Sequence, residues 1–421
     1  MGFLKYITFI FVLNYFFVLV TSAEPNAKDP NDDRDRYNVI IKSKSDCDKH
    51  YKWLKDNYNK TVIKSKQSIL SIKNKNSVKD FSVDGFYGYT AWFTQEFASK
   101  TLKQRDEVTV VEKDFTMKIN SVVPRRIENT VIQNINLDRL DKGSALDEKF
   151  EFPDTAGEGV NVFIVDTGIF KDHSDFGGRA KSGAFFCTNC ENDDDKNGHG
   201  TNVAGIVAGK TFGVAKKSTV IAVRVFNATG SGVNSDIING LTFVLDTHKK
   251  SKNKNSVVNM SLGGPKSDVL NKAVKALTDE GVHVVVAAGN DADDACKFSP
   301  SSEPTVITVG AVEVDPTDKK TSKIAFFSNF GKCTDIFAPG LGVLSAGVFS
   351  KFDLSVESGT SQATPHVAGT IALIIAKSGN QSPAKMATAL KDLSFKNAVD
   401  FGGNKTKEKD TANNLVRIPA P

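Results

Sequence analysis

The sequence has no long apolar segment after its first 20 residues. Its 421 residues include 54 basic and 49 acidic side chains, a net charge of +5, and only 6 histidines and 5 cysteines. Without further apolar segments, no later helix is expected to span a membrane. The small net charge gives no reason to expect a nucleic-acid partner. The few histidines leave a short set of candidates for a general base.

The N-terminus differs from the rest of the chain. Lys5 precedes an apolar run over residues 7–20, and the small residues of 21–23 follow it. This pattern predicts a secretory signal peptide, residues 1–23, cleaved after Ala23. A membrane anchor is the alternative, but the run is short for a span. We therefore expect a secreted protein, in a compartment where disulfides form.

Residues 24–36 are polar and rich in Asp, and they predict a linker. Residues 37–120 follow as a small α+β domain. Its strands are predicted at 37–41, 85–93 and 108–114, and its helices at 46–60 and 94–105. This alternation suggests one sheet covered by two helices.

Residues 121–421 have the pattern of an α/β domain. Apolar strands are predicted at 159–165, 219–225, 257–262, 282–287 and 305–309, and helices at 201–208, 235–248 and 268–280. Buried strands that alternate with helices predict a parallel sheet with helices on both faces. Ligands of such sheets bind at the carboxyl ends of the strands. Asp166, Ser261 and Asn290 fall at or just past strand ends, and His199 opens a helix.

Ser361 stands in the most specific stretch of the chain. Residues 359–369 read Gly-Thr-Ser-Gln-Ala-Thr-Pro-His-Val-Ala-Gly, and an apolar run continues to Gly379, a predicted helix C-cap. A hydroxyl at the mouth of this helix would lie among free backbone N–H groups and the positive helix end. An N-capping serine is the alternative for a bare Gly-Thr-Ser.

This stretch resembles the nucleophile motif of subtilisin-like serine proteases. Val165-Asp166-Thr167-Gly168 and the segment 197–205 around His199 are similar to that family's acid and histidine motifs. Taken alone, Asp166 would be interpreted as a turn Asp. A structural histidine is the alternative for His199. The order Asp166, His199, Ser361 is the known order of subtilisin, and three extended motifs in one order make chance agreement improbable.

The resemblance implies a role for each group. Asp166 would orient His199, which takes the proton of Ser361 and later protonates the leaving amine. Asn290, in Ala287-Ala288-Gly289-Asn290, would donate to the oxyanion. Two glycine-rich segments would flank an extended peptide substrate: Gly230, Ser231, Gly232, and Ser261, Leu262, Gly263, Gly264. Small Ala287, Ala288 and Gly289 imply a roomy, uncharged P1 pocket and broad, hydrophobic preference, because these motifs hold no acid to select Lys or Arg.

Residues 37–120 are similar to the inhibitory propeptide of secreted subtilases, in Gly-Tyr-Thr-Ala-Trp-Phe (88–93) and Val-Val-Glu-Lys-Asp (110–114). By this resemblance the propeptide helps residues 121–421 to fold and then blocks the cleft of a monomeric protease. Self-cleavage would fall near Asn120–Ser121, and the dibasic pair Arg125-Arg126 is an alternative site for another enzyme.

Residues 298–304 and 327–340 are similar to the fungal proteinase K branch. By that resemblance, the carbonyls of Pro304 and Val306 and the carboxylate of Asp335 are candidate Ca²⁺ ligands. An ordinary strand-end Asp is the alternative. Predicted disulfides are Cys296–Cys333, a pair seen in such relatives, and Cys187–Cys190, for which a zinc or redox site is less favoured in a secreted chain.

Two residues depart from the family motifs. Gln362 replaces the usual Met after the serine, and Asn202 replaces the usual His after His199-Gly200-Thr201. Neither change removes a catalytic group.

A catalytically silent binding protein with this fold is the competing hypothesis, and a lipase is a weaker one because the Gly-x-Ser-x-Gly elbow is missing. Asn-x-Ser/Thr sequons begin at Asn59, Asn227, Asn259, Asn380 and Asn404, and Asn259 is expected to carry no glycan.

Overall fold

The computed structural model describes residues 34–62, 78–119, 121, 135–142, 146–187, 190–315 and 321–421. The predicted signal peptide, most of the predicted linker, Asn120 and Arg125-Arg126 lie outside these residues. Residues Arg34–Pro421 form a single unit by their contacts. None of the described helices is both long and apolar enough to cross a membrane.

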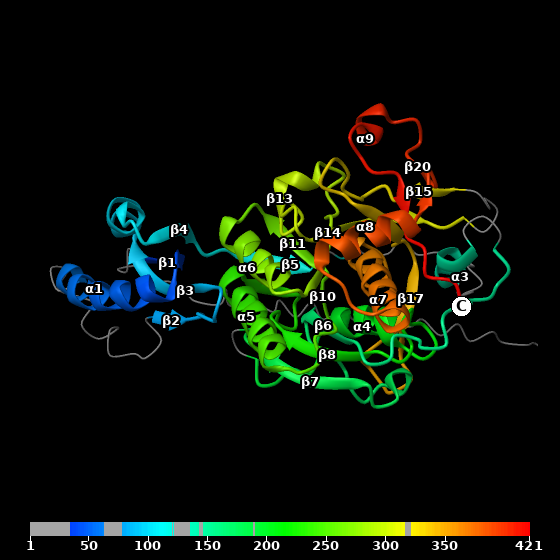
Figure 1. Ribbon diagram of the computed structural model, residues 1–421, viewed down its shortest axis with the longest axis horizontal. Coiled ribbons are helices and arrows are strands. Elements are labelled where there is room, and N and C mark those ends of the chain that lie inside the picture. The colour runs from blue at the N-terminus through cyan, green and yellow to red at the C-terminus, as the bar shows by residue number, and fades with distance from the viewer. Residues whose placement is uncertain are drawn as a thin grey trace, which may run out of the picture. The chain divides into compact units, whose positions relative to one another are not determined.

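The first strands form a four-stranded antiparallel sheet in the order β2-β3-β1-β4 (Figure 1). Its elements are β1 (Arg34–Ile41), α1 (Lys44–Val62), β2 (Val78–Asp80), β3 (Tyr87–Thr94) and β4 (Val108–Lys113). The predicted helix at 94–105 is irregular, with a π-helix at Phe97–Thr101 and a 3₁₀-helix at Leu102–Gln104. β1 begins inside the predicted linker because Arg36 forms an ion pair with Asp114 and its strand neighbours pair with β3.

The central sheet has the order β19-β21-β16-β14-β12-β10-β6-β8-β7, and every neighbouring pair from β7 to β21 is parallel. Its strands are β6 (Asn161–Asp166), β7 (Ala180–Phe185), β8 (Thr219–Arg224), β10 (Ser256–Met260), β12 (His283–Ala287), β14 (Ile307–Glu313), β16 (Ile336–Pro339), β19 (Phe395–Lys396) and β21 (Asn414–Leu415). Short β15 (Ser322–Ile324) and β20 (Val399–Asp400) extend it beside β14. The predicted parallel α/β sheet is therefore confirmed.

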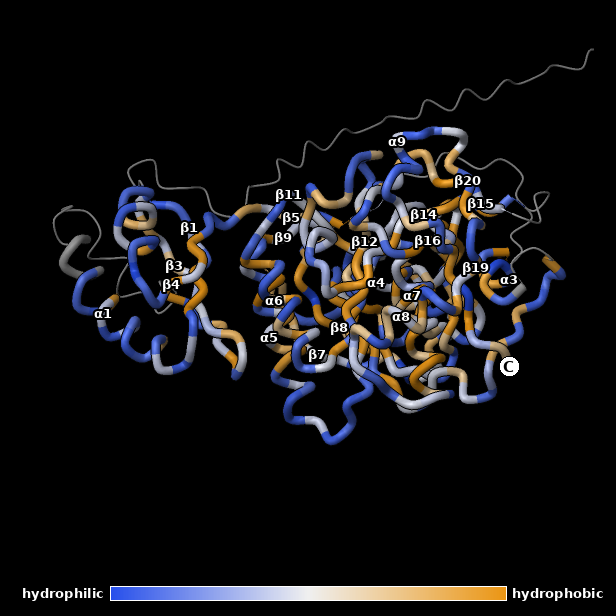
Figure 2. The backbone as a smooth tube through the Cα atoms, turned by 45° about the horizontal axis from the view of Figure 1, so that its top comes forward, coloured by the Kyte–Doolittle hydropathy of each residue, from blue (hydrophilic) through white to orange (hydrophobic). Residues whose placement is uncertain are grey.

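Helices cover both faces of this sheet (Figure 1). The larger ones are α4 (His199–Ala208), α5 (Asn234–Lys250), α6 (Asp268–Asp279), α7 (Thr360–Ser378) and α8 (Pro383–Leu393). One apolar core contains α4 and α7, and a second contains α5 and α6. Figure 2 shows hydrophobic residues along the strands between them. Each buried Val, Leu or Ile contributes about 1.5–3 kcal/mol to folding, so these cores hold the strand ends that carry the site.

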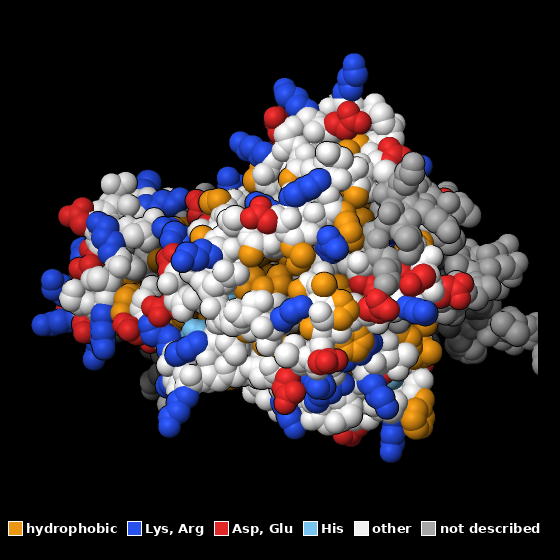
Figure 3. All heavy atoms as spheres, turned by 45° about the vertical axis from the view of Figure 1, so that its right-hand side comes forward, with side chains coloured by type: hydrophobic (Ala, Val, Ile, Leu, Met, Phe, Trp, Pro, Cys, Tyr) orange, Lys and Arg blue, Asp and Glu red, His pale blue; other side chains and the backbone are white. Residues whose placement is uncertain are grey.

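Shorter elements complete the chain. They are β5 (Thr116–Ile119), α3 (Ile135–Lys142), β9 (Ser231–Val233), β11 (Leu262–Pro265), β13 (Phe298–Ser299), β17 (Val343–Ala346), β18 (Leu354–Glu357) and α9 (Lys405–Glu408). Strands β13, β11, β5 and β9 form a separate sheet in that order. On the face drawn in Figure 3, basic and acidic side chains are interspersed.

Candidate active site

Asp166 and His199 meet at the end of β6. His199 Nδ1 lies 2.8 and 3.0 Å from the two carboxylate oxygens of Asp166, and both side chains are buried. The carboxylate also accepts the N–H of Thr167 at 2.7 Å. This arrangement fixes the tautomer of the ring, with the proton on Nδ1, and leaves Nε2 able to accept a proton.

The turn before α4 is organised by Asp195. Its carboxylate accepts the N–H groups of Asn197, Gly198 and Thr201 at 2.9 Å each and the hydroxyl of Thr201 at 2.7 Å. The hydroxyl of Thr167 donates to the same carboxylate at 2.9 Å. These hydrogen bonds to Asp195 fix the conformation of the loop that precedes His199. The sequence interpretation did not identify this role of Asp195. Its position two residues before an Asn-Gly pair is the signal for such an Asx turn.

Ser361 lies in the first turn of α7 and is fully buried in this state. Its hydroxyl donates to the carbonyl of Ser261 at 3.0 Å, and the Ser261 hydroxyl donates back to the carbonyl of Ser361 at 2.7 Å. His199 Nε2 is buried without a hydrogen-bond partner among the described residues. The ring nitrogen is therefore free to accept a proton, and the Ser361 hydroxyl is held by the carbonyl of Ser261 rather than by His199.

Asn290 follows β12 beside the start of α7. Its Oδ1 accepts both the N–H and the hydroxyl of Thr360 at 2.9 Å. Because Thr360 holds the amide oxygen of Asn290, the amide nitrogen points away from Thr360. The side chain of Asn329 supports this loop, since it accepts the N–H of Asp291 at 2.9 Å and donates to the carbonyl of Ala288 at 2.9 Å.

The pKa of His199 responds to three carboxylates. Burial alone lowers it, because the imidazolium loses solvation. The charge and hydrogen bond of Asp166, with smaller contributions from Glu357 and Asp195, outweigh burial and raise the pKa above its ordinary value. His366, also in the serine motif, is different: burial lowers its pKa to about 4. It is therefore a neutral packing residue of α7.

The two predicted substrate-binding segments lie on either side of one strand. β5 pairs antiparallel with β11, where Lys118 faces Gly263, and with β9, where Met117 faces Gly232. Gly230 accepts the N–H of Ile119 at 3.1 Å. A Cβ built on Gly264 would lie 2.4 Å from the sulfur of Met117. Glycines on β9 and β11 therefore leave room for the extended strand β5 between them.

The other residues predicted to bind substrate are buried at the end of β12. Ala287 ends β12, Ala288 follows it, and both are almost fully buried. Gly289 has a positive φ of 106°, which favours glycine, and its N–H donates to the hydroxyl of Thr360. None of these residues carries a charge.

The residues expected to bind calcium are already paired. One oxygen of the Asp335 carboxylate lies 2.6 Å from the Lys391 ammonium, and the other accepts the N–H of Thr308 at 2.9 Å. In the part of the chain that the structure describes, no group of three or more His, Cys, Asp and Glu side chains could hold a metal. As arranged, the Asp335 carboxylate is paired with the Lys391 ammonium, which supplies the positive charge that a calcium ion would bring.

Both predicted disulfides are present, Cys296–Cys333 and Cys187–Cys190. Cys47 is free and buried. Asn259 is fully buried, in keeping with the expectation that it carries no glycan.

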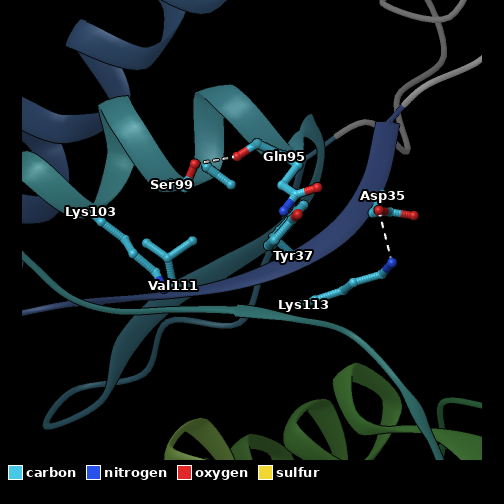
Figure 4. Close-up of a pocket in the computed structure, with 8 residues that line it drawn as sticks. Asp35, Tyr37, Gln95, Ser99, Lys103, Val111 and Lys113 are labelled. Atoms are coloured by element: carbon cyan, nitrogen blue, oxygen red, sulfur yellow. Dashed lines mark hydrogen bonds and ion pairs between the residues drawn. The ribbon is translucent and has the colours of Figure 1, made fainter.

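A hollow of about 310 Å³ lies on the N-terminal sheet and not at these residues (Figure 4). It is lined by Asp35, Tyr37, Gln95, Ala98, Ser99, Lys103, Val111 and Lys113. Its polar groups bond to one another, as in the ion pair of Lys113 with Asp35 at 2.8 Å. Its lining holds neither a histidine nor a cysteine.

Comparisons with known proteins agree with this geometry. The family model described as Peptidase_S8: Subtilase family matches residues 157–415. The subtilisin-like serine protease Cur l 4.0101 of Cochliobolus lunatus is 37% identical over 384 residues, 86% of this chain and 73% of that protein. Alkaline protease 2 of Aspergillus fumigatus is 38% identical over 370 residues, 81% of this chain and 71% of that protein.

A solved structure is similar as well. The crystal structure of a cold-adapted subtilisin-like serine proteinase aligns with a TM-score of 0.61 and 36% identity, covering 68% of this chain and 98% of that one. The family model spans more than half of the chain, and these relatives match most of it. The chain therefore belongs to the subtilase family and is a subtilisin-like serine endopeptidase.

Proposed function

We propose that this protein is a secreted endopeptidase, made as a zymogen, whose chemistry is carried by Asp166, His199, Ser361 and Asn290. One observation carries the proposal: a buried Asp166–His199 pair lies at the start of α4, which packs against α7, and the first turn of α7 carries Ser361. Ser361 bonds to Ser261, directly before β11, which pairs with the extended strand β5. The fungal relatives are named as subtilisin-like and alkaline proteases, which supports an extracellular location for this chain.

In the proposed mechanism, the Ser361 hydroxyl leaves the carbonyl of Ser261 by rotation about χ1 and turns to His199 Nε2. His199 accepts the proton as the oxygen attacks the peptide carbonyl, and it later protonates the leaving amine. Water then hydrolyses the acyl-enzyme. Asp166 stays ionised and stabilises the imidazolium.

The oxyanion of the tetrahedral intermediate would receive hydrogen bonds from the backbone N–H of Ser361 and from Asn290 Nδ2. Thr360 supports this role because it holds Asn290 Oδ1 and so directs the nitrogen the other way. On subtilisin itself, loss of this amide costs about 10²–10³ in kcat. We expect Asn290→Leu to lose activity on that scale with little change in KM.

Substrates would bind as β5 does, as an antiparallel strand between β9 and β11. If cleavage follows Asn120, then Ile119 and Met117 occupy the second and fourth positions before the scissile bond. Met117 is 1% exposed and packs on Gly264, so we propose a preference for apolar residues at the fourth position. Ala287, Ala288 and Gly289 support an uncharged pocket for a hydrophobic residue at the first position.

The same strand makes residues 37–120 a candidate inhibitor of the protein's own cleft, in a monomeric zymogen. A substrate cannot add to β9 and β11 while β5 occupies them. Removal of this segment, by self-cleavage near Asn120–Ser121 or by another enzyme at Arg125-Arg126, would open the cleft.

Calcium is commonly bound by subtilases. Here, Pro304, Val306 and Asp335 would hold it only after Lys391 leaves the carboxylate, so we propose that the ammonium stands in for the ion. The chemistry itself needs no cofactor.

A fluorophosphonate probe tests the proposed nucleophile. We expect covalent labelling of the mature protein that is lost in Ser361→Ala, with cleavage of casein lost in parallel. Ser358→Ala, a serine three residues away, serves as the matched control and keeps its label. Absence of labelling after removal of residues 1–120 would instead support a catalytically silent binding protein.

A further inference from the structure

The two residues that depart from the subtilase motifs meet in space at a third polar side chain. Gln362 Nε2 donates to Glu357 Oε2 at 3.0 Å and lies 3.5 Å from Asn202 Oδ1. Asn202 Nδ2 donates to the carbonyl of Ser355 at 3.2 Å, and the Ser355 hydroxyl donates to Glu357 Oε1 at 3.1 Å. This cluster joins β18 to α4 and α7.

Two members of the cluster, Gln362 and Asn202, lie close to proposed catalytic residues. Gln362 directly follows Ser361, and Asn202 lies one helical turn after His199, on the same side of α4. Both side chains are fully buried. The cluster therefore fixes a carboxylate beside the two helix starts that carry the nucleophile and the base.

Glu357 is a half-buried carboxylate, and no cation among the described residues is bonded to it. None of the ion pairs among the described residues includes it, and its hydrogen bonds come from neutral Gln362 and Ser355. A buried charge of this kind is costly unless an opposite charge compensates it. Through Gln362 and Asn202, this carboxylate is joined to the first turn of α4, which begins at His199. The imidazolium that His199 forms when it accepts a proton is a positive group that acts on Glu357 from there.

We propose that Glu357, held in place by Gln362 and Ser355, is a positioning residue for catalysis: a second carboxylate, besides Asp166, that stabilises the imidazolium of His199. This inference rests on the proposed role of His199 as the general base. Glu357 acts through His199 and contacts neither the substrate nor Ser361 in the proposal.

Carboxylates on three elements act on the charge of His199: Asp166 on β6, which bonds to the ring, Asp195 in the loop before α4, and Glu357 on β18. Burial raises the pKa of Glu357, and His199 opposes that shift. The two groups therefore titrate as a coupled pair. The ionised Glu357 favours the imidazolium and so raises the pKa of His199. At pH values below that pKa, His199 is already protonated and can no longer act as a base.

The experiment is the pH profile of kcat/KM for the mature enzyme and for Glu357→Gln, on one peptide substrate. Removal of the charge should move the acid limb to lower pH by about half a unit or more and lower the plateau kcat, with KM nearly unchanged. Gain of relative activity at low pH together with loss at high pH is a signature that a purely structural role does not produce. Asp246→Asn, which removes one charge from an exposed pair with Lys250, controls for net charge.

Gln362→Met provides a second variant that keeps the usual subtilase residue at this position. Loss of the 3.0 Å hydrogen bond makes ionised Glu357 less favourable, so the acid limb should shift in the same direction by a smaller amount. Unchanged acid limbs in an active Glu357→Gln enzyme, or in Gln362→Met if the first variant does not mature, would overturn the inference. An inactive wild-type enzyme would overturn the proposed function instead.

Discussion

Two carboxylates of the N-terminal region cap two helices of the protease region, and their removal should loosen the proposed inhibitor. Glu112 accepts the N–H of Asp268 at 3.0 Å and the hydroxyl of Ser267, the residue that caps α6. Asp114 accepts the N–H and hydroxyl of Ser235, in the first turn of α5, at 3.0 and 2.8 Å. Both helices thus receive a negative charge at the positive end of the dipole.

The magnitude follows from these contacts. A hydrogen bond to a charged group contributes about 1.5–3 kcal/mol, and a charge at a partly buried helix N-terminus up to about 2 kcal/mol. Burial raises the pKa of Glu112, so desolvation offsets part of its gain, and we assign it about 1 kcal/mol. With about 2 kcal/mol for Asp114, the double variant Glu112→Gln/Asp114→Asn should lose about 3 kcal/mol, or roughly 100-fold in the docking equilibrium.

The sequence provides its own fluorescent reporter. Its only two tryptophans, Trp53 and Trp92, both lie in the N-terminal region. In a Ser361→Ala background, which prevents the proposed self-cleavage, tryptophan fluorescence during urea unfolding follows this region. The double variant should lower the midpoint by about 2 M, taking about 1.5 kcal/mol per molar urea for a small domain. Glu96→Gln, an exposed carboxylate paired only with Lys100, should leave the midpoint unchanged. A double-variant midpoint equal to that of the Ser361→Ala parent would refute the capping argument.

Three further predictions concern other parts of the chain. Gln362 cannot form a sulfoxide, so peroxide should inactivate Gln362→Met faster than the wild-type enzyme, and equal inactivation rates would contradict this. EDTA should leave the melting temperature of the wild-type protein nearly unchanged. The variant Lys391→Met frees the Asp335 carboxylate, so calcium should raise the melting temperature of that variant. A wild-type protein that melts at a much lower temperature in EDTA would count against Lys391 as the substitute cation. The Cys296–Cys333 disulfide closes 37 residues, so Cys296→Ser/Cys333→Ser should lose about 4 kcal/mol of unfolding free energy in the chain-entropy account, and a loss below about 1 kcal/mol in chemical denaturation would contradict that account.

The fold class was accessible from sequence because its signals are local. Buried strands such as 257–262 are short apolar runs, and helices such as 268–280 have an apolar face and a capping Ser267, which accepts the N–H of Leu270 at 3.1 Å. The predicted ends of the strands then identify Asp166 and Asn290 as candidate site residues. A helix was predicted after β3, but its π-helical and 3₁₀ turns were not, because the local pattern indicates only helix. Phe97 and Leu102 in these turns are buried.

The sequence by itself therefore determined the family, the parallel sheet and the identity of the proposed catalytic residues, because motif order and periodicity are written along the chain. Only the tertiary structure brought Gln362 to Asn202, 160 positions away, and Lys391 to Asp335, 56 positions away. It also revealed Asp195 as the residue that holds the His199 turn. Such partners are chosen by the path of the folded backbone, and no local pattern specifies which distant polar group a buried side chain will meet.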